Sequence, residues 1–204
     1  MRNVKIGKIK VFYKKEHDGG GIKFYKEFCN ILKKKKKINN TLEFCSGPGF
    51  IAFGLLNYNI TKKITLVDIN KKIIKGLRKT IKFNNLNDKC NFYFGDGLQA
   101  LKNKKIKFDL IVSNPPHIDM KNVKFKLPND KKIIYDDTDF KIHKNFFKNV
   151  HNFLNPTGLI LFIENSLQST FGDIVKKNKY PKLIFLRSPK TNLPNKYYIY
   201  AKRR

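Results

Sequence analysis

The segment best suited to chemistry is Ser113-Asn114-Pro115-Pro116-His117, which directly follows the apolar run Phe108–Val112. Two consecutive prolines cannot continue a sheet, so a strand must end here on a stiff loop. The Asn114 side-chain oxygen and the Pro115 carbonyl are two hydrogen-bond acceptors on that loop. Together they can hold both hydrogens of a planar NH2 group and favour the pyramidal nitrogen that forms as it attacks an electrophile. The alternative is a rigid strand exit in which Asn114 only caps the turn.

Glycines and carboxylates follow three earlier apolar runs. Gly47 and Gly49 lie in a turn between an expected strand and helix, where the backbone can approach a ligand closely. Asp68 comes about 20 residues later, the spacing at which an acidic side chain binds ribose hydroxyls. Asp96 follows the third run. Because the carboxyl ends of parallel strands share one edge of a sheet, the sequence predicts a nucleotide-like cofactor beside Asn114.

Strands alternate with helices after residue 40, which predicts an α/β fold: a mostly parallel sheet with helices on both faces. The expected strands are 41–45, 63–67, 91–94, 108–112, 159–163, 182–186 and 197–201. The expected helices are 50–56, 71–83, 98–101, 140–154 and 167–177, with a turn at 155–158 and a long loop over 118–137.

Residues 1–40 form an N-terminal arm, and residues 41–204 form the cofactor-binding domain. We expect a strand or hairpin within 1–21 and a helix over 22–32. Gly19, Gly20 and Gly21 require a loop between them, either as a linker or as backbone that approaches a ligand. Long irregular segments in compact domains are usually functional or disordered, so we expect this loop and 118–137 to border the acceptor site.

Composition bounds the class of protein. The chain has 204 residues, enough for one well-packed domain, and no apolar run near the ~20 residues that span a bilayer. Three widely spaced cysteines suggest neither a disulfide framework nor a metal site, and we expect a cytoplasmic monomer with no metal. The net charge of +29 favours nucleic-acid partners, but 39 of the 44 basic residues are lysines scattered along the chain, which also fits compositional drift.

Two motifs resemble those of a known family. Glu43-Phe44-Cys45-Ser46-Gly47-Pro48-Gly49 is similar to the first motif of Rossmann-like methyltransferases that use S-adenosyl-L-methionine (SAM). Asn114-Pro115-Pro116-His117 resembles their fourth motif, in the form used by enzymes that methylate planar amino or amide nitrogens. The resemblance covers about residues 41–165 and is strongest to small enzymes such as release-factor glutamine methyltransferases and rRNA guanine methyltransferases.

This resemblance implies a seven-stranded sheet whose last strand is inserted antiparallel. It also implies SAM as cofactor, with the methionine side lined by Glu43, Gly47 and Gly49, the ribose held by Asp68 and the adenine near Asp96. Cys45 and Asn114 would contact the cofactor too, and the catalytic group would be Asn114, Pro115 and His117. Cys45 replaces a usual glycine, and we read it as a small buried side chain. His117 replaces a usual aromatic residue and either stacks on the acceptor, donates a hydrogen bond, is structural or faces solvent.

The leading hypothesis is a SAM-dependent N-methyltransferase acting on a macromolecule, either an rRNA or tRNA base or a protein glutamine. One alternative is an inactive nucleotide-binding module recruited to RNA or ribosomes through its basic surface. Another is an NAD-dependent oxidoreductase, which the glycine turn and Asp68 also fit, although Asn-Pro-Pro-His has no role in hydride transfer.

Polar residues near the second half of the sheet have simpler interpretations. His143 and His151 are expected at the surface or in packing, and the acidic cluster 136–139 is expected to cap the helix after it. Glu164 and Asn165 follow a strand and either border the substrate or form a turn.

Overall fold

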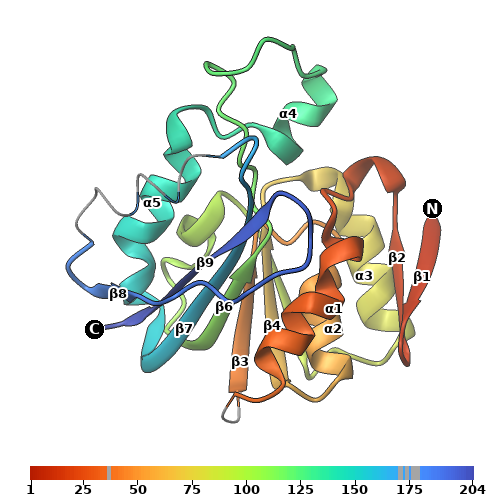
Figure 1. Cartoon of the computed structure of the whole chain (residues 1–204). Helices are drawn as coiled ribbons and strands as arrows, with labels where there is room; N and C mark the ends of the chain where they lie inside the picture. The colour runs from red at the N-terminus through yellow and green to blue at the C-terminus, as the bar shows by residue number, and fades with distance from the viewer. Residues whose placement is uncertain (36–37, 170–171, 173–174, 176–179) are drawn as a thin grey trace.

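The computed structural model describes residues 1–35, 38–169, 172, 175 and 180–204. Within these ranges the chain forms a seven-stranded sheet in the order β5-β4-β3-β6-β7-β9-β8 (Figure 1). Neighbours from β5 to β7 are parallel, and β9 is antiparallel to both β7 and β8. The last strand is thus inserted antiparallel, as expected. The strands are β3 Ile38–Phe44, β4 Thr61–Asp68, β5 Cys90–Phe94, β6 Phe108–Ser113, β7 Leu154–Asn165, β8 Leu183–Phe185 and β9 Lys196–Arg203.

The strand order places a topological switch between β3 and β6. The chain runs outward from β3 through β4 to β5 and then returns to add β6 on the other side of β3. A crevice forms outside the carboxyl ends of the two strands at such a point, and ligands bind there in open α/β sheets. The Ser113 hydroxyl donates to the Phe44 carbonyl at 2.5 Å, which ties the two strand ends together.

Both faces of the sheet are covered by apolar layers. Leu110 and Val112 of β6 belong to one buried cluster and Ile111 to the other, because successive side chains of a strand point to opposite faces. The first layer holds α1 (Gly21–Leu32), α2 (Phe50–Asn57) and α3 (Ile74–Phe83), and the second holds α5 (Lys141–Asn149). Helix α2 is buried from Phe50 to Leu56 because it packs against both the sheet and α1.

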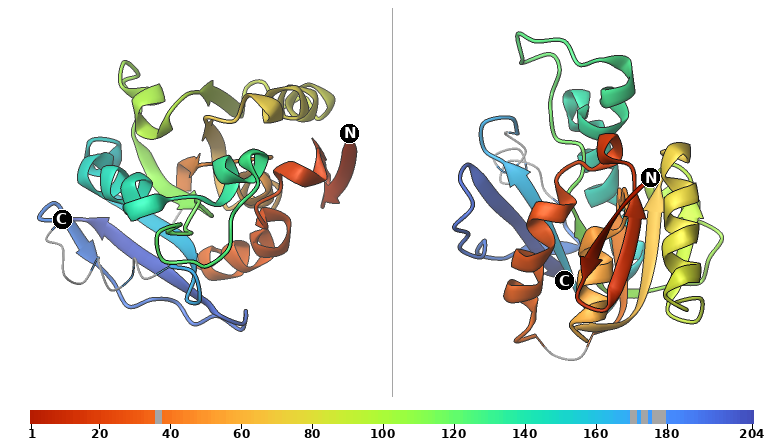
Figure 2. Two further views of the ribbon diagram at one scale, coloured as in Figure 1. Left: turned by 90° about the horizontal axis from the view of Figure 1, so that it is seen from above. Right: turned by 90° about the vertical axis from the view of Figure 1, so that its right-hand side faces the viewer.

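The N-terminal arm packs on the first layer. Strands β1 (Arg2–Ile6) and β2 (Ile9–Tyr13) form the expected hairpin, which lies beside α3 (Figure 2). The Phe12 N–H donates to the Thr80 hydroxyl of α3 at 2.9 Å. The expected helix over 22–32 is confirmed as α1, and β3 begins at Ile38, three residues before the expected strand. No helix in the described ranges is both long and apolar enough to cross a membrane.

Several expected boundaries are wrong for identifiable reasons. The helix expected over 140–154 ends at Asn149, a 3-10 turn follows over Val150–Asn152, and β7 already begins at Leu154. Leu154 pairs with Phe108, and Leu159 pairs with Leu110, so residues 155–158 lie within β7 at an irregularity of the register and do not form the expected turn. The segment expected as helix 71–83 is a 3-10 turn over Lys71–Ile73 followed by α3.

The loop expected over 118–137 contains helix α4 (Asn129–Tyr135), so that expectation is wrong for these residues. Pro128 precedes the helix, and the Asp136 N–H closes it on the Lys132 carbonyl. Figure 1 shows α4 above the carboxyl end of the sheet. The helix expected over 167–177 lies largely outside the described residues, and its first two residues, Leu167 and Gln168, lie in a turn.

Candidate active site

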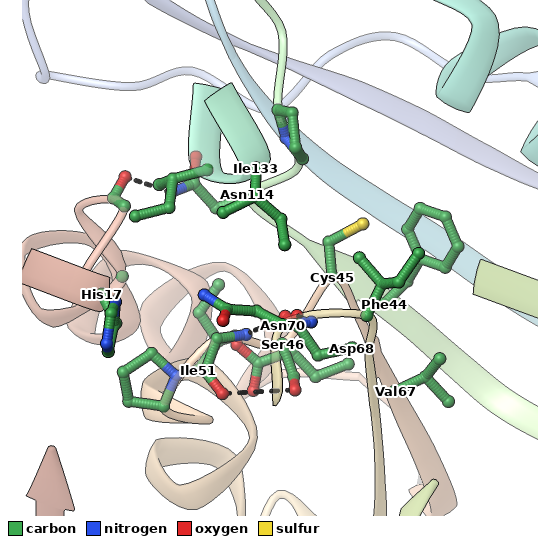
Figure 3. A pocket seen from close by; sticks show the side chains of 18 of the residues that line it. His17, Phe44, Cys45, Ser46, Ile51, Val67, Asp68, Asn70, Asn114 and Ile133 are labelled. Carbon is green, nitrogen blue, oxygen red and sulfur yellow. Dashed lines mark hydrogen bonds between the residues drawn. The ribbon is translucent and has the colours of Figure 1, made fainter. Parts of the chain in front are cut away.

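A pocket lies at the carboxyl ends of β3, β4 and β6, where the switch point predicts it (Figure 3). It brings together six of the residues expected to bind a cofactor: Glu43, Cys45, Gly47, Asp68, Asp96 and Asn114. Gly49, Pro115 and His117 are not among the residues that line it. Gly49 instead precedes α2 in a left-handed conformation, with φ 81°, where an added Cβ would lie 2.8 Å from the Phe53 ring.

Backbone hydrogen bonds connect the Asp68 carboxylate to the glycine turn. The Gly47 N–H donates to Asp68 Oδ2 at 2.7 Å, and the Asn70 N–H donates to Oδ1 at 2.7 Å. Gly47 reaches this position with φ 49°, a region that favours glycine. Burial raises the pKa of the Asp68 carboxyl, and the two N–H donors oppose that shift. Each carboxylate oxygen has two lone pairs, so Asp68 can still accept hydrogen bonds from a ligand's hydroxyls.

Glu43 supports the pocket from beneath. Its carboxylate lies inside the protein, only 3% exposed, and accepts the Ala52 N–H of the first turn of α2 at 2.7 Å. Burial raises the pKa of Glu43 to about 8. This contact fixes the start of α2 against β3, so that the helix N-terminus faces the pocket.

Cys45 occupies a position that suits glycine. Its φ is 51°, in the left-handed region, immediately after β3. Burial raises the pKa of its thiol well above the ordinary value, so the sulfur is not an activated nucleophile. Cys29, Cys45 and Cys90 are all free thiols.

Asn114 lies between two hollows. Its side-chain Nδ2 donates to the Gly19 carbonyl at 2.8 Å, and no hydrogen bond in the described part of the chain involves its Oδ1. Asn114 and Gly19 line both the first pocket and a second one. This second pocket is lined further by Phe24, His117, Ile118, Phe125, Leu127, Tyr135, Gln168 and Lys196. A fixed amide therefore stands where the two pockets meet, and its acceptor oxygen is available to a ligand.

His117 and the Pro115 carbonyl are paired with each other. His117 Nδ1 lies 3.0 Å from the Pro115 oxygen, and the side chain is 9% exposed. Burial lowers the pKa of His117, which the nearby Glu164 carboxylate opposes. A neutral imidazole that donates from Nδ1 to Pro115 leaves Nε2 as an acceptor. The Pro115 carbonyl keeps one further lone pair for another donor.

Two parts of the pocket come from segments that carry no sequence motif. His17 and Asp18 of the N-terminal arm line it, as do Ile133 and Ile134 of α4. Asp18 Oδ1 accepts the Gly20 N–H at 2.9 Å, which shapes the glycine loop before α1. The sequence left the three glycines as either a linker or backbone that approaches a ligand, and nothing in it pointed to His17.

A buried ionic network joins α5 to β7 through His143 and Glu164. His143 Nδ1 contacts Asp137 Oδ2 at 2.5 Å, and Nε2 contacts Glu164 Oε1 at 2.9 Å. Burial opposes the charge of His143, but the Glu164 and Asp137 carboxylates raise its pKa to about 9. His143 is a fully buried packing residue, and Asp137 caps α5 as expected by accepting the Ile142 N–H at 2.7 Å. His151 lies nearer the surface, beside the Lys182 ammonium.

Comparison with known proteins agrees with this geometry. A family model described as the methyltransferase small domain matches residues 6–177. The release factor glutamine methyltransferase of Fusobacterium nucleatum is 31% identical over 142 residues, which cover 67% of this chain and 40% of that protein. The ribosomal protein uL3 glutamine methyltransferase of Francisella tularensis is 32% identical over 97 residues, which cover 48% and 30%. The chain thus spans less than half the length of these relatives.

Among solved structures, M. capricolum TrmK in complex with S-adenosylhomocysteine (SAH) superposes with a TM-score of 0.61 at 12% identity. The match covers 87% of this chain and 67% of that one, and it shows a shared fold. That neighbour holds SAH, which is what remains of SAM after its methyl group has been transferred. With its model matched over residues 6–177, this chain belongs to the methyltransferase small domain family.

Proposed function

We propose that this chain transfers a methyl group from SAM to a planar amide or amino nitrogen of a macromolecule. The observation that carries the proposal is the position of Asn114 between two adjoining pockets. Its Nδ2 is held by Gly19, and its Oδ1 has no hydrogen-bond partner among the described residues. An N-methyltransferase needs a cofactor on one side of such a group and an acceptor on the other.

The first pocket has the groups that a SAM molecule requires. Asp68 retains acceptor capacity for ribose hydroxyls, the Gly47 turn brings backbone close, and Asp96 lies at the same edge near the expected adenine. We propose that these residues hold the cofactor. When bound, SAM supplies a methyl group on a sulfonium, which is already a strong electrophile.

The second pocket is proposed as the acceptor site. Asn114 Oδ1 would accept a hydrogen bond from one N–H group of the acceptor. The Pro115 carbonyl, although Pro115 lines neither pocket, is proposed to accept one from the other N–H group. The two hydrogen bonds would orient the nitrogen and favour attack. Methyl transfer would form the N–C bond from the nitrogen lone pair, break the C–S bond of the sulfonium and release one N–H proton to water. His117, Phe24, Phe125 and Tyr135 supply flat walls on which a planar group can pack.

We favour a protein glutamine as the acceptor over a nucleic-acid base. The relatives from Fusobacterium nucleatum and Francisella tularensis are named glutamine methyltransferases of a release factor and of ribosomal protein uL3. The net charge of +29 is the observation that favours RNA, or a ribosome-bound role without catalysis.

The test incubates the purified chain and methyl-labelled SAM separately with a release factor, ribosomal protein uL3, ribosomal RNA and tRNA. We expect label in a protein, with peptide mass spectrometry placing one added methyl on a glutamine side chain. Label in RNA alone would replace the protein acceptor with a base. Tight SAH binding with no transfer to any of the four would favour the inactive module.

A further inference from the structure

His17 is an unusual residue for the wall of a pocket. It lies in the 3-10 turn Lys15–His17, only 8% exposed, and neither Nδ1 nor Nε2 has a hydrogen-bond partner within the described residues. It lines the first pocket, and Figure 3 shows its ring on the side away from Asp68, with Ser46 and Asn70 between them. Buried polar atoms in native proteins are nearly always paired, and the described residues leave both nitrogens of this ring for a bound ligand to pair.

The backbone around His17 is firmly placed. The His17 N–H donates to the Lys14 carbonyl at 3.0 Å, and Lys131 of α4 donates to the Glu16 carbonyl at 3.1 Å. A Cβ added to Gly47 would lie 3.5 Å from the His17 carbonyl oxygen, so the turn sits directly beside the glycine turn that holds Asp68. The unpaired ring is therefore a fixed feature of the pocket wall.

The charges that line the pocket indicate what the ring would bind. Four acidic residues line it: Asp18, Glu43, Asp68 and Asp96. His17 is the one basic side chain among the described residues that line it. Ribose hydroxyls and the amino and sulfonium groups of SAM suit carboxylates, whereas its α-carboxylate needs an N–H donor.

We propose that His17 is a cofactor-binding residue that donates a ring N–H to the α-carboxylate of SAM. This proposal rests on the proposed function and adds a group from the N-terminal arm to the cofactor site. Under this proposal, Asp68 binds the ribose hydroxyls of SAM, and His17, on the opposite side of the pocket, binds its α-carboxylate. Burial lowers the pKa of His17, so the free protein holds a neutral ring, which still has one N–H to donate.

The test compares two ligands on two proteins. Calorimetry measures binding of SAH and of decarboxylated SAH, which lacks only the carboxylate, to the wild type and to His17→Phe. We expect His17→Phe to bind SAH about 10- to 100-fold more weakly, which corresponds to about 1.4–2.8 kcal/mol. Its affinity for decarboxylated SAH should stay within about twofold of the wild type.

Thermal unfolding without ligand separates this role from a structural one. Since phenylalanine removes two unpaired buried nitrogens, the melting temperature of His17→Phe should equal or exceed that of the wild type. His17→Gln keeps an N–H donor and should retain most of the SAH affinity. His17→Leu replaces His17→Phe if the larger ring prevents folding, and His151→Ala, outside both pockets, is the control with unchanged binding.

Each other outcome overturns the proposal. An equal loss of affinity for both ligands would show that His17 does not contact the carboxylate. Unchanged SAH binding in folded apolar variants would make His17 a packing residue. Failure of the wild type itself to bind SAH would instead refute the proposed function, which is a separate result.

Discussion

Replacing Asp68 with asparagine tests how the cofactor is held. Asp68 accepts one backbone N–H on each carboxylate oxygen, from Gly47 and Asn70, both at 2.7 Å. Asparagine has nearly the same shape but turns one oxygen into an NH2 donor, so one backbone N–H must lose its acceptor. An unpaired buried donor costs about 1–3 kcal/mol, and the lost acceptor for a ribose hydroxyl costs about 1 kcal/mol more on binding.

We therefore expect Asp68→Asn to weaken SAH binding by roughly fivefold and to lower the free energy of unfolding by about 1–3 kcal/mol. Calorimetry and urea unfolding measure the two quantities. Asp96→Asn is the matched control, since its exposed side chain makes no capping hydrogen bond and its unfolding free energy should not change. A folded Asp68→Asn protein that binds SAH within twofold of the wild type would refute the assignment of the ribose site.

Three further predictions concern the surroundings of the site. His143 has a folded pKa of about 9, above its ordinary 6.5, so its contribution to the free energy of unfolding is complete below pH 6.5 and is lost as pH rises through 9. In His143→Gln, the free energy of unfolding measured with urea should change less over this pH range than in the wild type. Gly49→Ala should lower the unfolding free energy by about 1–3 kcal/mol, because φ is 81° and the new Cβ would meet Phe53; unchanged stability would contradict this reading. His117→Ala should raise the KM for the acceptor while SAH affinity stays constant, since His117 lines only the second pocket; weaker SAH binding would place it at the cofactor instead.

The sequence predicted those parts of the candidate site whose positions follow from where residues lie relative to the strands along the chain. Asp68, Asp96 and Asn114 each follow an apolar strand, and parallel pairing alone brings strand ends to one edge. The glycine turn could be placed in the same way, because positive φ at Gly47 and Gly49 is a local property.

The rest depends on contacts between distant segments. His17 reaches the pocket only because the hairpin packs on α3 through Phe12 and Thr80, residues 68 positions apart. The charge of His143 follows from Glu164, which lies on another element and faces α5 rather than the substrate. Helix α4 is short and has no buried residue, so it left no apolar pattern to recognise. The early start of β7 reflects pairing with β6, which overrides a Pro- and Gly-containing segment.

Asn114→Ala examines the chemistry most directly, because the proposed mechanism places its free Oδ1 on the acceptor NH2 group. Single-turnover methyl transfer to the identified substrate gives the rate, and calorimetry gives the SAH affinity of the same protein. Losing one preorganised partner of the transition state typically slows a reaction about 100- to 1,000-fold. We predict a loss of that size in the transfer rate, with SAH affinity within about threefold of the wild type. Near-normal transfer by Asn114→Ala would contradict the amine-polarising role and leave the loop as a structural exit from β6.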